Sequence, residues 1–127
     1  MLTTVPAEET AEGEVLFSVE CPALKKQVVL LKETWYGHII NPKTGHPYMK
    51  SKKGLVQNAV QGIVSDKQFF RFSDCAASEW FADYACPDFE PLAKFLRVAF
   101  KRLDTGMIVV TSAYRQARGI ISYEQSG

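Results

Sequence analysis

The chain has 127 residues, of which 46% are hydrophobic and 23% charged, with a formal net charge of +1. This length fits a single domain that buries roughly two-thirds of its unfolded surface, and the composition is that of an ordinary globular protein. No apolar run approaches the ~20 residues of a membrane span, and the three cysteines show no C-x-x-C spacing, so we expect a cytoplasmic protein with reduced thiols and no membrane partner.

The small net charge hides alternating blocks of opposite sign. Residues 1–20 carry five acids and no base, and residues 25–53 carry seven lysines and one acid. Residues 66–90 carry six acids and two bases, and residues 94–118 carry six bases and one acid. If the two basic blocks meet in the fold, they form a cationic surface suited to a phosphate-bearing ligand. The alternative is that these cations merely solvate the surface.

The N-terminal third combines a polar tail with two short apolar segments. Residues 1–13 are rich in Glu and Thr and are expected to form a disordered acidic tail. They lack the cationic and apolar regions of a secretory signal. The remaining residues, 14–127, form one expected domain, in which alternation predicts a strand over 14–20. The apolar run at 26–31 indicates a second strand or a buried segment.

Two helices are predicted next. Thr34 is a plausible N-cap for a short helix over 35–40, which Asn41-Pro42 ends. Trp35 and Ile39 fall on one face of this helix and are expected to pack inward, with His38 at the flank. A second helix is predicted over 52–64, where apolar residues recur at helical spacing.

The apolar period then changes to two, which is typical of strands. Four strands are predicted, over 68–73, 78–86, 94–103 and 107–114. Asp104-Thr105-Gly106 is a tight-turn signal and predicts a hairpin between the last two strands. We therefore expect an α+β fold, with N-terminal strands and two helices packed on one face of a four-stranded antiparallel sheet.

Both histidines of the chain, His38 and His46, lie in one short aromatic stretch. Histidine titrates near neutral pH and is the natural proton carrier there. We expect His46 to be the less firmly positioned of the two, because it lies in a turn between Gly45 and Pro47. The eight-residue separation offers no zinc spacing, and no glycine-rich phosphate loop occurs, so no metal or other cofactor is predicted.

Cations and hydroxyls that suit phosphate chemistry lie in the last two predicted strands. Alternation puts Arg97 and Lys101 on one strand face, opposite the apolar positions. Metal-independent RNA cleavage needs a base, an acid and cations at the phosphate. His38 would transfer protons, Arg97 with Lys101 or Arg115 would stabilise charge, and Tyr114 would stack on a base or donate its hydroxyl. The competing interpretation is that each of these is an ordinary structural residue.

The order of four short motifs resembles a known family. The motifs are W-x-x-H-I at 35–39, H-P-x-M at 46–49, F-L-R-V-x-F at 95–100 and G-x-I-V-V-T-x-x-Y at 106–114. Together they resemble the phage and bacterial nuclease-like domains of the barnase–EndoU–colicin–RelE (BECR) superfamily. The resemblance implies a helix-then-antiparallel-sheet fold and a metal-independent endoribonuclease that cleaves RNA by 2′-OH transesterification, as a toxin or phage effector. An antitoxin or immunity protein is then a possible partner.

By position, the resemblance implies a catalytic set, and the histidine segment and the basic blocks predict an RNA-binding set. The catalytic set is His38, Arg97, Thr111 or Ser112, and Tyr114. The RNA-binding set is His46, Lys50, Lys52, Lys53, Lys101 and Arg115. The alternative is a non-catalytic RNA- or protein-binding module of the same fold. A common cleft onto which His38 and Arg97 open would favour the enzyme.

Overall fold

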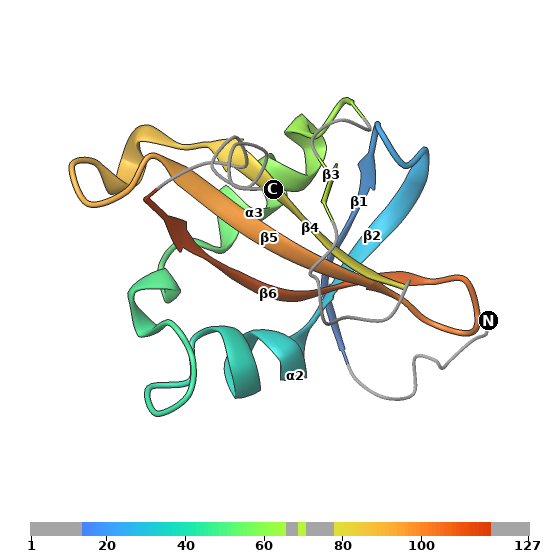
Figure 1. Cartoon of the computed structure of the whole chain (residues 1–127). Helices are drawn as coiled ribbons and strands as arrows, with labels where there is room; N and C mark the ends of the chain where they lie inside the picture. The colour runs from blue at the N-terminus through green and yellow to red at the C-terminus, as the bar shows by residue number, and fades with distance from the viewer. Residues whose placement is uncertain (1–13, 66–68, 71–77, 118–127) are drawn as a thin grey trace.

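The computed structural model describes residues 14–65, 69–70 and 78–117. Its centre is a six-stranded mixed sheet with the order β1-β2-β6-β5-β4-β3 (Figure 1). The strands are β1 (Val15–Cys21), β2 (Lys26–Leu31), β3 (Phe69–Phe70), β4 (Glu79–Ala85), β5 (Phe95–Arg102) and β6 (Ile108–Gln116). The predicted tail at 1–13, most of the predicted strand at 68–73 and Cys75 lie outside the described residues.

The four C-terminal strands pair antiparallel in chain order, as the sequence predicts. The hairpin between β5 and β6 turns at Gly106, whose φ of 93° is a conformation that glycine adopts at little cost. The Leu103 N–H donates to the Met107 carbonyl at 2.8 Å and closes this turn. The α+β class and this hairpin are therefore confirmed.

The predicted place of the N-terminal strands is wrong. Rather than pack on the face of a four-stranded sheet, β1 and β2 extend that sheet, and β2 pairs parallel to β6 through Val28↔Ile108 and Val29↔Val109. The physical reason lies in the apolar run of β2. Val28 belongs to the main hydrophobic core, whereas Val29 is buried outside it, so this strand is apolar on both faces and suits the interior of a sheet.

The helical segments are shorter and more varied than the sequence predicts. They are α2 (Lys32–Thr34), the π-helix η2 (Trp35–Ile39), the 3-10 helices η3 (Pro47–Met49) and η5 (Pro87–Phe89), and α3 (Lys53–Gly62). Thr34 is not the N-cap of a helix that begins there, because the helical chain starts at Lys32 and the Thr34 side chain makes no capping hydrogen bond. None of the helices in the described part of the chain is long and apolar enough to cross a membrane.

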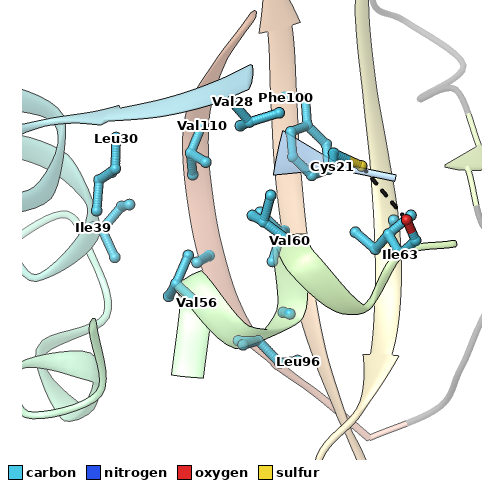
Figure 2. Packing of buried hydrophobic residues seen from close by; sticks show 14 of the residues in the cluster. Cys21, Val28, Leu30, Ile39, Val56, Val60, Ile63, Leu96, Phe100 and Val110 are labelled. Carbon is cyan, nitrogen blue, oxygen red and sulfur yellow. Dashed lines mark hydrogen bonds between the residues drawn. The ribbon is translucent and has the colours of Figure 1, made fainter. Parts of the chain in front are cut away.

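The helices cover one face of the sheet, as expected, and build the hydrophobic core there. Figure 2 shows Val56 and Val60 of α3 and Ile39 of η2 directed toward side chains of the sheet. Leu96, Val98 and Phe100 of β5 belong to this core, which confirms the alternation predicted for that strand. The Cys21 thiol donates to the Ile63 carbonyl oxygen at 3.6 Å, across the end of α3.

Candidate functional site

A compact turn joins η2 to η3 and is organised by one side chain. The Asn41 Oδ1 accepts hydrogen bonds from the N–H groups of Lys43 (2.8 Å) and Thr44 (3.2 Å). The Asn41 Nδ2 donates to the Gly37 carbonyl of η2 at 3.2 Å, and the Gly45 N–H donates to the Asn41 carbonyl at 2.8 Å. This turn is thereby fastened to the π-helix that precedes it.

The same turn fixes the main chain of His46. Its N–H donates to the Ile39 carbonyl at 2.6 Å. The Gly45 main chain lies so close to the His38 carbonyl oxygen that a Cβ at position 45 would overlap it. Pro47 then starts η3 directly after His46. The backbone of His46 is therefore anchored, although its setting between glycine and proline led us to expect a loosely positioned residue.

His46 lies in a group of rings and a cation that we call the His46 cluster, made of His46, Tyr48, Phe89, Tyr114 and Arg115. The His46 imidazole stacks on Tyr114, with centroids 4.9 Å apart and planes 25° apart, and meets Tyr48 edge-on at 5.8 Å. Tyr48 meets Phe89 edge-on at 6.1 Å. The Arg115 guanidinium lies 4.0 Å from the centroid of the Tyr48 ring, and the main-chain N–H of Arg115 donates a hydrogen bond to the Tyr48 hydroxyl at 2.9 Å.

The surroundings of the imidazole favour its neutral form. Partial burial lowers the pKa of His46 below its ordinary value, and the positive charge of Arg115 lowers it further. Both causes act in the same direction because each penalises the charged imidazolium. At neutral pH His46 therefore carries a free lone pair on one ring nitrogen and can accept a proton.

Arg97 is placed quite differently from the expectation of a phosphate ligand. Only 2% of Arg97 is exposed, and its Nε and NH2 groups donate to the two carboxylate oxygens of Asp83 at 2.7 and 2.9 Å. Its guanidinium also lies 4.2 Å from the Phe81 ring centroid. The bidentate fork of Arg97 is therefore directed at a buried carboxylate. Because Arg97 is almost fully buried, it does not open onto a cleft shared with His38, which is exposed on η2.

The strand register locates the predicted hydroxyls. Tyr114 lies opposite Arg97 and Ser112 lies opposite Ala99, so Ser112 and Tyr114 share a sheet face as the sequence indicates. Thr111 falls at a register shift, because Ala99 pairs with Ser112 and the next residue of β5 pairs with Val110. A bulge at this point separates Thr111 from the regular alternation of β6.

The predicted cations divide between two regions. Lys101 pairs with Val109 near the start of β6, roughly 15 Å along the strand from Tyr114 at ~3.3 Å per residue. Lys50 and Lys52 lie between η3 and α3, and Lys53 is the first residue of α3, all close in sequence to the His46 cluster. The Lys52 ammonium lies 5.7 Å from the Phe89 ring centroid, at the edge of that cluster. The structure thus brings together His46, Tyr114 and Arg115 with Lys52, and leaves Lys101 apart.

Two residues that organise these sites were absent from the sequence-based candidates. Tyr48 contacts the guanidinium and the main-chain N–H of Arg115. Its position two residues after His46, in a stretch rich in aromatic residues, could have marked it as a candidate. Asp83 holds Arg97, and its signal was an acid within the apolar run of β4 at the same alternation as Phe81. Among the residues that the structure describes, no three His, Cys, Asp or Glu side chains gather into a group that could hold a metal ion.

Comparison with known proteins gives no relative for this chain: no family model matches it, and no curated protein or solved structure does so either.

Proposed function

We propose that this chain is a metal-independent endoribonuclease-like domain that cleaves RNA by 2′-OH transesterification, with His46 as the general base. The observation that carries this proposal is the arrangement of the His46 imidazole, which stacks at 4.9 Å on Tyr114 and lies beside the cationic Arg115. A proton carrier and a guanidinium, which RNA cleavage uses, occur in one cluster with an aromatic surface that can hold a base.

The reaction assigns one task to each group. His46 takes the proton of the ribose 2′-OH, and the 2′-oxygen attacks phosphorus as the bond to the 5′-oxygen breaks. The leaving 5′-oxygen accepts a proton, which gives a 2′,3′-cyclic phosphate and a 5′-hydroxyl. Arg115 stabilises the negative charge that develops on the phosphoryl oxygens, and the rings of the cluster hold an adjacent base by stacking.

His38 is the candidate for the acid that protonates the leaving group. Its side chain is exposed on η2, and its carbonyl oxygen contacts the main chain of Gly45, the residue before His46. Two histidines on adjoining turns supply one proton acceptor and one proton donor. Arg97, which the family resemblance assigns to the catalytic set, acts in this proposal through the fold, because its guanidinium is paired with Asp83.

A second candidate function is RNA binding without cleavage. It is favoured by the buried position of Arg97, which removes from the surface the cation that the sequence assigns to the phosphate. The rings and the remaining cations of the His46 cluster suffice for binding, because stacking and phosphate contacts require no proton transfer.

Incubation of the purified protein with a labelled single-stranded RNA in EDTA separates these functions. We expect cleavage to a 2′,3′-cyclic phosphate, and His46→Ala to slow it by roughly 10²–10⁴-fold, the usual contribution of a positioned base. Arg115→Ala is expected to slow it comparably, and Lys101→Ala serves as a matched cation control with little effect. RNA that is bound but remains intact in every buffer supports the binding module; strict dependence on Mg²⁺ contradicts the proposed mechanism.

A further inference from the structure

The π-helix η2 divides its residues sharply between core and solvent. The Ile40 N–H donates to the Trp35 carbonyl, five residues back, at 2.9 Å. This wide turn keeps Trp35 and Ile39 buried at one end of the core, whereas the intervening Tyr36, Gly37 and His38 are exposed. Tyr36 is 55% exposed, which makes it one of the four exposed large hydrophobic residues in the described part of the chain.

This exposed face is rigidly connected to His46. The Asn41 side chain binds the Gly37 carbonyl, the His46 N–H binds the Ile39 carbonyl, and Gly45 packs on the His38 carbonyl. Three contacts therefore hold η2 and the turn that carries His46 as one unit. A ligand strand that lies across His46 has the π-helix as its neighbouring surface.

Tyr36 belongs to a segment of the chain whose net positive charge suits a polyanion. Residues 32–53 contain five lysines and a single acid, Glu33. Lys32 is paired with Glu14 at 2.9 Å, but both side chains are more than half exposed, and an exposed pair of this kind contributes at most about 1 kcal/mol. Lys43 and Lys50 are exposed on the same stretch of chain. An exposed aromatic ring on a cationic segment is a feature that proteins use to bind single-stranded nucleic acids.

We infer that Tyr36 forms a second base-stacking subsite, which takes the unpaired base of a nucleotide that neighbours the one held at the His46 cluster. The inference rests on the proposed action on RNA and specifies its substrate as single-stranded RNA longer than one nucleotide. A base paired within a duplex cannot present its face to Tyr36, so double-stranded RNA is excluded from this subsite.

The test is binding of a fluorescent 2′-O-methyl tetranucleotide, which lacks the free 2′-OH and is not cleaved. Tyr36→Ala is expected to weaken binding roughly 5- to 100-fold, the range given by loss of one base–aromatic stack. Tyr36→Phe keeps the ring and should bind as the wild type does. Leu92→Ala removes a comparably exposed apolar side chain, 66% exposed, and should leave affinity unchanged. Melting temperatures of all three variants should equal that of the wild type.

The outcomes distinguish this inference from the proposed function. Tyr36→Ala that binds the tetranucleotide as tightly as wild type overturns the inference, even if RNA cleavage is observed. Wild-type protein that binds a blunt RNA duplex as tightly as the tetranucleotide also overturns it. If Tyr36→Ala weakens binding but the wild-type protein cleaves no RNA, the stacking subsite is supported and only the proposed cleavage activity is contradicted. A wild-type protein that binds no oligonucleotide at low salt overturns both.

Discussion

The imidazole of His46 and the ring of Tyr114 stack with centroids 4.9 Å apart, which joins the turn before η3 to the last strand of the sheet. Next to this stack, the Arg115 N–H donates to the Tyr48 hydroxyl at 2.9 Å. Two successive residues of β6 thus contact two rings two residues apart: Tyr114 contacts His46 in the turn, and Arg115 contacts Tyr48 in η3. The His46 ring itself contacts both Tyr114 and Tyr48.

Substitution of Tyr114 tests the stack. Tyr114→Ala exposes the imidazole, and the pKa of His46 should rise toward its ordinary value because partial burial is the larger cause of its depression. We expect RNA cleavage to slow at the same time, since the base loses its fixed position. Tyr114→Phe keeps the ring and should have a mild effect on both. Titration of the His46 ring protons by NMR measures the pKa, and an unchanged value in the alanine variant would contradict a packing role for Tyr114.

The pH dependence of cleavage follows from the lowered pKa of His46. Only the neutral imidazole accepts a proton, so kcat/KM should rise with pH through an apparent pKa below 6.5, and it should fall again at higher pH once the general acid has lost its proton. Arg115→Lys preserves a positive charge and should keep the curve in place, whereas Arg115→Ala should move it to higher pH.

The free energy of unfolding should depend on pH for the same reason. The unfolded chain binds the proton of His46 more readily than the folded chain, so the contribution of this residue to stability is fully present above about pH 6.5. It decreases on acidification toward the lower pKa of the folded state. The decrease should be smaller in His46→Gln.

Local sequence patterns predicted much of the fold. Alternation identified β4, β5 and β6 within one or two residues, and the Asp104-Thr105-Gly106 signal identified their last turn. These features depend on neighbours in sequence, which periodicity and turn chemistry report directly. The parallel pairing of β2 with β6 joins distant segments, and no local pattern specifies such a partner.

The candidate site shows the same limit. The sequence indicated that the aromatic stretch and the end of the last strand matter, and His46, Tyr114 and Arg115 do meet there. It did not indicate that Arg97 faces Asp83, because a cation that alternates with apolar residues looks the same whether solvent or a carboxylate lies above it. Residue spacing likewise did not indicate that the backbone of His46 is anchored, because this follows from the close approach of Gly45 to the backbone of His38 and Ile39.

Two glycines offer a matched test of the turn that carries His46. A Cβ at Gly45 would overlap backbone atoms of His38 and Ile39, whereas a Cβ at Gly54 meets nothing within 4 Å. Gly45→Ala should reduce the free energy of unfolding by about 1–3 kcal/mol, as overpacking typically does. Gly54→Ala lies within α3 and should increase it by up to about 1 kcal/mol. Urea unfolding measures both, and a Gly45→Ala variant as stable as Gly54→Ala would show that the turn is not constrained.

The cations near α3 are expected to bind phosphates. RNA affinity should fall steeply with salt concentration, because each contacted phosphate releases counterions. Lys52→Glu and Lys53→Glu should each weaken binding and reduce the slope of log K against log salt by about 1. Cleavage should occur at the same positions in the RNA. Lys101→Glu makes the same charge change near the start of β6, opposite Val109, and should have a smaller effect; an equal effect would show that RNA also contacts that end of the sheet.

Arg97 and Asp83 provide the test that separates structure from chemistry. Their side chains are 3% and 2% exposed, and removal of either one leaves a buried charge without its partner. Arg97→Ala or Asp83→Leu alone should cost about 3–5 kcal/mol of folding stability, measured by chemical denaturation. The double variant Arg97→Met with Asp83→Leu replaces both charges by apolar groups and should recover most of that loss, since such replacements are often neutral or stabilising. If the role of Arg97 is to stabilise the fold, the double variant should cleave RNA near the wild-type rate. A double variant that is stable yet inactive would instead indicate that Arg97 contacts the reacting phosphate, as the family resemblance implies.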